Sequence, residues 1–295
     1  MPTADNTDTT DNTSTSAKAL KAGSEVNISG GELKIDSADD SVHSNGNIVI
    51  TGGNISVASG DNGMHANGNL TISDGTVDIT KSYEGIEGSI VTIDGGTISV
   101  VASDDGINCA GGSDTGSTDR MGADQFSSQD GVELNINGGT VTIDAEGDGL
   151  DSNGNFTMAG GTVYVCGPTN GGNGALDYNG TATVTGGTLI ACGAVGMEEG
   201  FGDNSTQYSV LHDLGSTVSA NEKLTITDSD GKEILSFTPT KTWQSVVFTG
   251  ADLKKGETYT ITAGSQSETV TIDGIVTSNS KGMRFGRGHG GGRGF

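Results

Sequence analysis

The sequence is poor in basic residues, proline and aromatic side chains, and these shortages exclude several kinds of protein. Its 295 residues include 14 Lys and Arg against 38 Asp and Glu, which gives a formal net charge of -24. Nucleic acid is therefore excluded as a partner, because a polyanion would be repelled. Only 3 prolines accompany 51 glycines, and no Gly-X-Y period is present, so the chain is not collagen-like.

Long apolar runs are missing as well. No run of about 18 apolar residues occurs, so we expect no transmembrane segment. The opening residues Met1 to Asp5 are not followed by the apolar stretch of a signal peptide. We therefore expect either a cytosolic protein or one whose export signal has been removed. Hydrophobic residues make up only 32% of the chain, so any core must be narrow and regularly patterned.

A glycine pair or an Asp-Gly pair recurs along the first two thirds of the chain. Apolar residues alternate with polar ones on both sides of it, as at Ile48 and Ile50 before Gly53 and at Ile55 and Val57 after it. Alternation with a period of two predicts half-buried strands. The two strands of each repeat would meet at a corner where glycine accepts a positive φ. The second residue of the pair is Gly31, Gly53, Gly75, Gly96, Gly139, Gly161 or Gly187.

A third apolar element follows each pair of strands. It stands in related phrases, such as Ser41 to Gly46 and Gly149 to Gly154, most of which end in Asn-Gly. Asn-Gly favours a left-handed corner. Three strands per repeat of roughly 22 residues, with no helical pattern between them, predict an all-β fold, a parallel β-helix. About seven rungs at roughly 4.8 Å each would form a column of about 30 Å.

Composition divides the chain into four parts. Residues 1–24 are rich in Ser, Thr and Asp and are predicted to be a disordered linker. Residues 25–204 carry the repeat, and residues 205–275 show strand patterns without it. We interpret 205–275 as a small β cap that covers the open C-terminal rung, because the ends of solenoids need protection. Residues 276–295 form a tail rich in Gly and Arg, and we expect the protein to be a monomer.

Acidic residues crowd around the third element of the repeat. Residues 25–200 hold 25 Asp and Glu against 3 Lys and Arg. Stacking of rungs would place these carboxylates about 5 Å apart, where like charges repel. Raised pKa values or a bound hard cation would relieve the repulsion, and oxygen ligands at this density favour Ca²⁺. A solvated acidic edge without any ion is the alternative. The candidate ligands form two patches, Asp39, Asp40, Asp61, Asn62 and Glu84, and Asp104, Asp105, Asp148, Asp151 and Asp177.

Other polar residues are candidates for contact with a ligand. His43 and His65 occupy equivalent positions on successive rungs, which we expect to face outward, where the pair could bind a sugar or a metal or simply fill a polar position. Arg120 lies in an insertion, residues 111–130, beside the second patch. This loop either carries binding function or is a tolerated excursion. Cys166 and Cys192 should be direct neighbours, and two packed thiols are favoured over a disulfide because in-register strands give awkward geometry.

Several phrases resemble a known family. The chain resembles the carbohydrate-binding β-helix family first described from a cellulosome-producing clostridium, whose members are similar in fold to pectate lyases. The resemblance covers roughly residues 25–275 and implies a right-handed β-helix in an extracellular or cell-surface protein that binds acidic plant cell-wall polysaccharide and calcium. The rungs of Glu84 and of Ala175 depart from the Asp-Asp-Gly-Ile form. The phrases that carry the resemblance are Asp104-Asp105-Gly106-Ile107-Asn108 and Asn62-Gly63-Met64-His65-Ala66-Asn67-Gly68-Asn69.

Four functions remain open from the sequence. The first is non-catalytic binding of polysaccharide, in which Ca²⁺ bridges protein and uronate carboxylates. The second is a calcium-dependent polysaccharide lyase, which needs a base, and Lys81 and Arg120 are the candidates between residues 35 and 200. The third is hydrolysis by paired carboxylates, such as Asp104 or Asp105 with Asp148. The fourth is a structural or adhesive surface solenoid.

Overall fold

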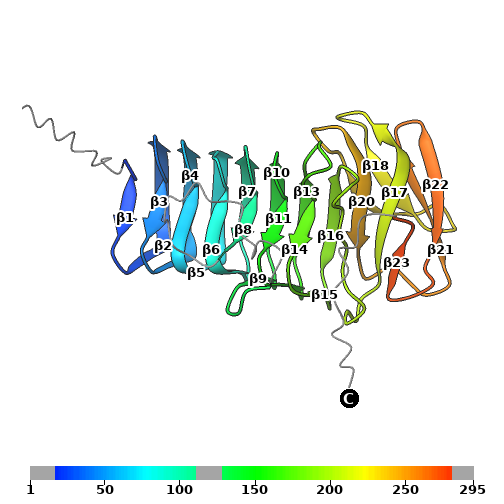
Figure 1. The fold of residues 1–295 in the computed structure, drawn as a ribbon, viewed down its shortest axis with the longest axis horizontal. Coiled ribbons are helices and arrows are strands. Elements are labelled where there is room, and N and C mark those ends of the chain that lie inside the picture. The colour runs from blue at the N-terminus through cyan, green and yellow to red at the C-terminus, as the bar shows by residue number, and fades with distance from the viewer. Residues whose placement is uncertain (1–16, 111–127, 281–295) are drawn as a thin grey trace, which may run out of the picture.

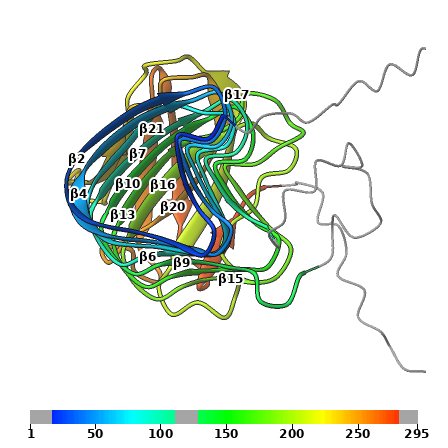
Figure 2. The same cartoon turned by 90° about the vertical axis from the view of Figure 1, so that its left-hand side faces the viewer.

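The computed structural model describes residues 17–110 and 128–280, which form strands and turns without a helix. Stacked parallel strands build a solenoid of about seven turns, with further strands at its C-terminal end (Figure 1). Viewed along the column, successive rungs superimpose and leave three faces (Figure 2). The predicted all-β fold and its parallel solenoid are therefore confirmed. Among the described residues there is no helix that could cross a lipid bilayer.

Three parallel sheets form the faces of the column, and several strands turn a corner and contribute to two of them. The first face stacks the leading parts of β2 and β4, the middle of β5, the last part of β6, and then β9, β12 and β15. The second face stacks the later parts of β2, β4 and β5, and then β7, β10, β13 and β16. The third face stacks β1, β3, the starts of β5 and β6, and then β8, β11 and β14. The strands of the column are β1 (Leu20–Ala22), β2 (Glu25–Ser37), β3 (Val42–Ser44), β4 (Asn47–Ser59), β5 (Met64–Lys81), β6 (Ile86–Ile93), β7 (Thr97–Ala102), β8 (Ile107–Cys109), β9 (Glu133–Ile136), β10 (Thr140–Ala145), β11 (Leu150–Ser152), β12 (Asn155–Met158), β13 (Thr162–Cys166), β14 (Leu176–Tyr178), β15 (Ala182–Val184) and β16 (Thr188–Gly193).

The interior is a narrow stack of aliphatic side chains. Alternate residues of each strand point inward, so Ile48, Leu70 and Val91 align on one face and all have no exposed surface. Phe156 and Phe201 widen the core near its C-terminal end, with ring centroids 5.4 Å apart. Cys109 is buried in this core, as its place in the alternation predicted.

Glycine serves two different purposes at the corners. In each recurring pair, the second residue, a glycine, has the predicted positive φ, for example 104° at Gly53. The Asn-Gly corners differ from expectation, because no asparagine or glycine of these corners has a positive φ. Glycine is needed there for space instead: a Cβ on Gly154 would lie 1.8 Å from the carbonyl oxygen of Val132 on the preceding rung.

The first strand begins earlier than the sequence indicated. Leu20–Ala22 pairs in parallel with Val42–Ser44, so residues predicted to be linker form the third-face strand of an additional partial rung. The structure gives a reason, since Leu20 packs on the hydrophobic core and covers its N-terminal end. Residues 1–16 lie outside the described part of the chain.

The C-terminal strands do more than cover the last rung. β17 and β20 extend the second face in antiparallel fashion from β16, and a separate sheet of four strands packs beside them. A second hydrophobic core joins this unit to the outer side of the column, where Ile190 and Cys192 are buried against it. The strands are β17 (Ser209–Val218), β18 (Leu224–Thr227), β19 (Glu233–Phe237), β20 (Trp243–Thr249), β21 (Thr258–Ala263), β22 (Gln266–Thr271) and β23 (Val276–Ser278).

Candidate functional site

Two parallel columns of polar side chains run along one corner of the solenoid, where the second face turns into the third. We call the first the turn column, because its members lie in the turn before the third face. Backbone hydrogen bonds between rungs align its members, Asp40, Asn62, Glu84, Asp105 and Asp148. We call the second the strand column, because its members stand in register on the third face itself. It consists of His43, His65, Glu87, Asn108, Asp151 and Asp177.

The acidic residues are thus brought to one edge, as the repeat predicted, but they are divided between two positions of the rung. Side chains of the two columns face each other across the turn, as shown by the hydrogen bond of 2.8 Å between His43 Nδ1 and Asp40 Oδ2. Asp39, Asp61 and Asp104 precede the turn column by one residue each.

At the N-terminal end the acids are neutralised by the protein. The ammonium group of Lys18 forms ion pairs with Asp39 and Asp40. Asp40 also receives hydrogen bonds from His43 and from the backbone N–H of Asn62. Burial acts to raise the pKa of Asp39, but the N–H groups of Asp40 and Ala17 and the charge of Lys18 hold it below its usual value. Asp39 and Asp40 of the first predicted patch therefore already have a cation.

The two histidines do not face outward as expected. His43 and His65 are 2% and 1% exposed, and their ring centroids lie 4.9 Å apart. Each ring is held by an acid, since His65 Nδ1 lies 2.9 Å from Glu87 Oε2. Their alternation does place them on the outer side of the third face, but the turn before the strand covers them. Direct contact between these rings and a polysaccharide is therefore blocked in this structure.

From Glu84 onward both columns are acidic, and the electrostatics change. Burial is the largest cause that raises the pKa of Glu84 to about 8, and the charges of Glu87 and Asp105 add to it. Burial and then the charge of Asp105 raise the pKa of Asp148, also to about 8. Asp151 and Asp177 shift in the same direction, mainly through burial. Among the residues that the structure describes, no lysine or arginine forms an ion pair with Glu84, Asp148, Asp151 or Asp177.

The chemistry of this cluster fits a hard divalent cation. We call Glu84, Glu87, Asp105, Asp148, Asp151 and Asp177 the carboxylate cluster. Asn108 stands within it on the strand column, and its Oδ1 atom is buried without a hydrogen-bond partner. Carboxylate and amide oxygens are the ligands of Ca²⁺, which takes six to eight of them. The cluster therefore offers the kinds of oxygen ligand that calcium takes. The described ligand atoms that already lie within 4.8 Å of one another belong instead to the first patch and its histidines, in the groups Asp40, His43 and His65, and Asp39, Asp40 and Asp61.

Three residues of the site were missed or undervalued by sequence reasoning. Lys18 lies in the segment interpreted as linker, although the spacing from Leu20 to Val42 repeats the spacing of later rungs. Glu87 and Asn108 belong to the strand column and could have been found from their places directly after the apolar residues Ile86 and Ile107. Arg120, the predicted polysaccharide contact, lies outside the described residues, as does most of its loop.

The cysteines lie where the repeat placed them. Cys166 and Cys192 are partners in the register of β13 and β16, and both are buried free thiols. The asparagines of the Asn-Gly corners are only partly linked to one another. The side-chain N–H of Asn179 donates to Asn153 Oδ1 over 3.0 Å, whereas Asn45 Oδ1 lies 3.0 Å from His43 Nε2.

Comparison with known proteins identifies the family. Neither the curated proteins nor the solved structures give a match. A family described as carbohydrate-binding domain-containing protein matches residues 2–63 and 64–174, more than half of the chain. These segments include both columns except for Asp177. The chain therefore belongs to the family of carbohydrate-binding domain-containing proteins.

Proposed function

We propose that the protein is a non-catalytic extracellular protein that binds acidic, pectic polysaccharide through Ca²⁺ held by the carboxylate cluster. The observation that carries this proposal is the pair of facing acidic columns between Glu84 and Asp177, in which burial and mutual repulsion raise the pKa of four carboxyl groups. Membership of a carbohydrate-binding family supports polysaccharide as the ligand.

Calcium resolves the electrostatic problem of two acidic partners. A polyuronate carries one carboxylate per sugar, so it would be repelled by a protein of net charge -24. A divalent ion attracts both, and its six to eight ligand positions can be shared between protein and sugar oxygens. Asp105, Asp148, Asp151 and Asp177 are each partly exposed, so an ion that they hold remains accessible from the solvent.

The roles of the residues follow from their positions. Glu84 is the most buried member of the cluster, at 7% exposure, and would ligate from the inner side. Asp148 is already oriented by the backbone, since its Oδ1 accepts a hydrogen bond from the N–H of Gly174. Asp105 is held in the same way by the N–H of Asp148, 2.7 Å away. These contacts position the carboxylates before any ion arrives, which reduces the entropy lost on binding.

The test is retention of the protein on immobilised polygalacturonate, with Ca²⁺ and with a chelator. We expect retention only with Ca²⁺, and a loss of at least tenfold for Asp148→Asn and Asp151→Asn. Asp252→Asn, an exposed change in the cap, is the matched control and should bind as the wild type does.

Two outcomes would contradict the proposal. Retention that survives the chelator would remove calcium from the mechanism. Absorbance of unsaturated sugar ends in the eluate would instead establish a polysaccharide lyase, and loss of that product in Arg120→Ala would assign the base.

A further inference from the structure

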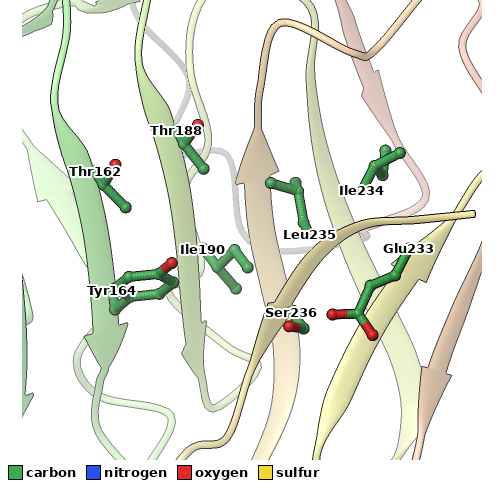
Figure 3. A pocket seen from close by; sticks show the side chains of 8 residues that line it. All are labelled: Thr162, Tyr164, Thr188, Ile190, Glu233, Ile234, Leu235 and Ser236. Atoms are coloured by element: carbon green, nitrogen blue, oxygen red, sulfur yellow. The ribbon is translucent and has the colours of Figure 1, made fainter.

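A cleft of about 330 Å³ lies between the column and the C-terminal unit (Figure 3). One wall is the outer side of the second face, and the other is strand β19 of the C-terminal unit. The lining residues are Thr162, Tyr164, Thr188 and Ile190 on the first wall and Glu233, Ile234, Leu235 and Ser236 on the second. Its volume is at the lower end of the range for small-ligand sites, and large enough for one sugar ring.

Contacts between the two walls hold the cleft open. The rings of Tyr164 and Phe237 stack with centroids 5.3 Å apart and 26° between planes. Further along the same face, Lys241 reaches back from the C-terminal unit to Asp144 at 2.8 Å. These two contacts anchor the C-terminal end of β19 and the segment after it to the column.

A column of threonine hydroxyls leads along the second face into this cleft. The threonines stand in register, one per rung, and their spacing is that of neighbouring strands, about 4.8 Å. Those distant from the cleft are exposed, and the last two form part of its wall. An extended polymer lying parallel to the column would meet a hydroxyl at every rung and end against β19. The members are Thr76, Thr97, Thr140, Thr162 and Thr188.

The chemistry of the lining selects the kind of ligand. Hydrogen bonds from Ser236 and then from Lys223 hold the pKa of Glu233 below its usual value, so this carboxylate is an ionised acceptor at neutral pH. Glu233 is the only charged residue of the lining and already pairs with Lys223 at 2.9 Å, so the lining offers no unpaired cation to a uronate. The hydroxyls of Thr162 and Thr188 add donors and acceptors, while Ile190 and Leu235 offer apolar surface. A neutral pyranose presents hydroxyl groups around its edge and C–H groups on its faces, and matches both features.

We propose that this cleft is a second carbohydrate subsite, which binds a neutral sugar residue without calcium. The proposal rests on carbohydrate binding as the proposed function, but not on the calcium mechanism. A polysaccharide that carries both acidic and neutral sugars would therefore contact the same solenoid at two places, the carboxylate cluster and the cleft beside β19.

The experiment is calorimetric titration of the full chain with two probes, a neutral β-1,4-linked galactose oligosaccharide and an oligogalacturonate, each with Ca²⁺ and with a chelator. We expect the neutral probe to bind equally in both conditions. Glu233→Gln and Tyr164→Phe should each weaken that binding at least tenfold and leave oligogalacturonate binding unchanged. Glu257→Gln, an exposed change elsewhere in the C-terminal unit, is the control, and thermal unfolding of each variant reports its fold.

Each result separates the two proposals. Binding of oligogalacturonate without any binding of the neutral probe would overturn the second subsite and leave the calcium proposal standing. Binding of the neutral probe that is lost with the chelator, or is unaffected by both cleft variants, would also overturn it. Loss of oligogalacturonate binding alone would refute only the calcium mechanism.

Discussion

The carboxylate cluster makes the calcium-free protein sensitive to alkali, and a single substitution should remove much of that sensitivity. Asp148 has its pKa raised from 3.8 to about 8 in the folded chain, whereas in the unfolded chain it returns to the ordinary value. Between these two pH values the unfolded state binds fewer protons than the folded one. Stability that is fully present below about pH 4 is therefore lost as the pH rises toward 8.

The size of the effect follows from the same shift. Each pKa unit corresponds to about 1.36 kcal/mol, so at pH 7 the cost of keeping Asp148 folded is on the order of 4 kcal/mol. Glu84, which shifts from 4.5 to about 8, adds on the order of 3 kcal/mol. The two costs do not add fully, because both groups respond to the charges of Asp104 and Asp105. Neutralising one acid in Asp148→Asn should recover roughly 1–3 kcal/mol at pH 8 and almost nothing at pH 4.

The assay is thermal unfolding in the presence of a chelator at pH 5 and pH 8, followed by addition of Ca²⁺. Wild type should melt lower at pH 8, and Ca²⁺ at about 100 times its Kd should restore about 2.7 kcal/mol. Asp148→Asn should melt higher than wild type at pH 8 without Ca²⁺ and gain less from the ion. The reasoning is refuted if Asp148→Asn is destabilised equally at both pH values, or if Asp252→Asn behaves in the same way.

Three further predictions test the fold around the site. Lys18→Met leaves the buried carboxylate of Asp40 without its cation and should lower the free energy of unfolding, measured by chemical denaturation at pH 7, by about 3 kcal/mol. The exposed Lys21→Met is the control and should change the same free energy by less than about 0.5 kcal/mol. Equal effects of the two substitutions would show that Lys18 does not neutralise Asp39 and Asp40. Gly154→Ala places a Cβ 1.8 Å from the carbonyl oxygen of Val132 and should cost several kcal/mol in urea unfolding, more than Gly131→Ala, whose positive φ is strained but whose surroundings are open. Phe156→Ala empties part of the core and should cost about 3–5 kcal/mol by the same measurement, and a loss below about 1 kcal/mol would contradict its packing against Phe201.

The solenoid could be predicted because its physical signals are local and repeated. Alternation of apolar residues marks each strand, and the glycine pair marks each corner. Where the pattern is weak in one rung, the same pattern in the neighbouring rungs still identifies the strand. The positive φ at Gly53 and its equivalents follows directly from this pattern. The role of Gly154 could not be found in this way, because its constraint is the approach of the neighbouring rung, which depends on packing rather than on local conformation.

The candidate site was only partly predictable, because it depends on which residues face each other between columns. The sequence places Asp40 and Asp148 in equivalent turns. It does not show that Lys18 forms an ion pair with Asp40, whereas no lysine of the described residues forms one with Asp148. Burial of His43 and His65 was missed for a similar reason: alternation gives the side of the strand, and only the path of the preceding turn shows that this side is covered. The cleft beside β19 was beyond prediction, since it joins segments that are distant in the sequence.

The acidity of the middle rungs is not required by the fold, and this favours a ligand as its cause. The turn column accepts the neutral Asn62 and the strand column accepts His65 and Asn108, all with the same backbone pairing as their acidic neighbours. Uncharged residues at Glu84, Asp148 and Asp151 would therefore keep the register and avoid the cost of several raised pKa values. Proteins retain such unfavourable clusters of like charge mainly at functional sites, where binding of the ligand offsets the free-energy cost of the repulsion. The proposed cation, shared with a polysaccharide, would supply that energy, and the conflict begins beyond the rungs where Lys18 pairs with Asp39 and Asp40.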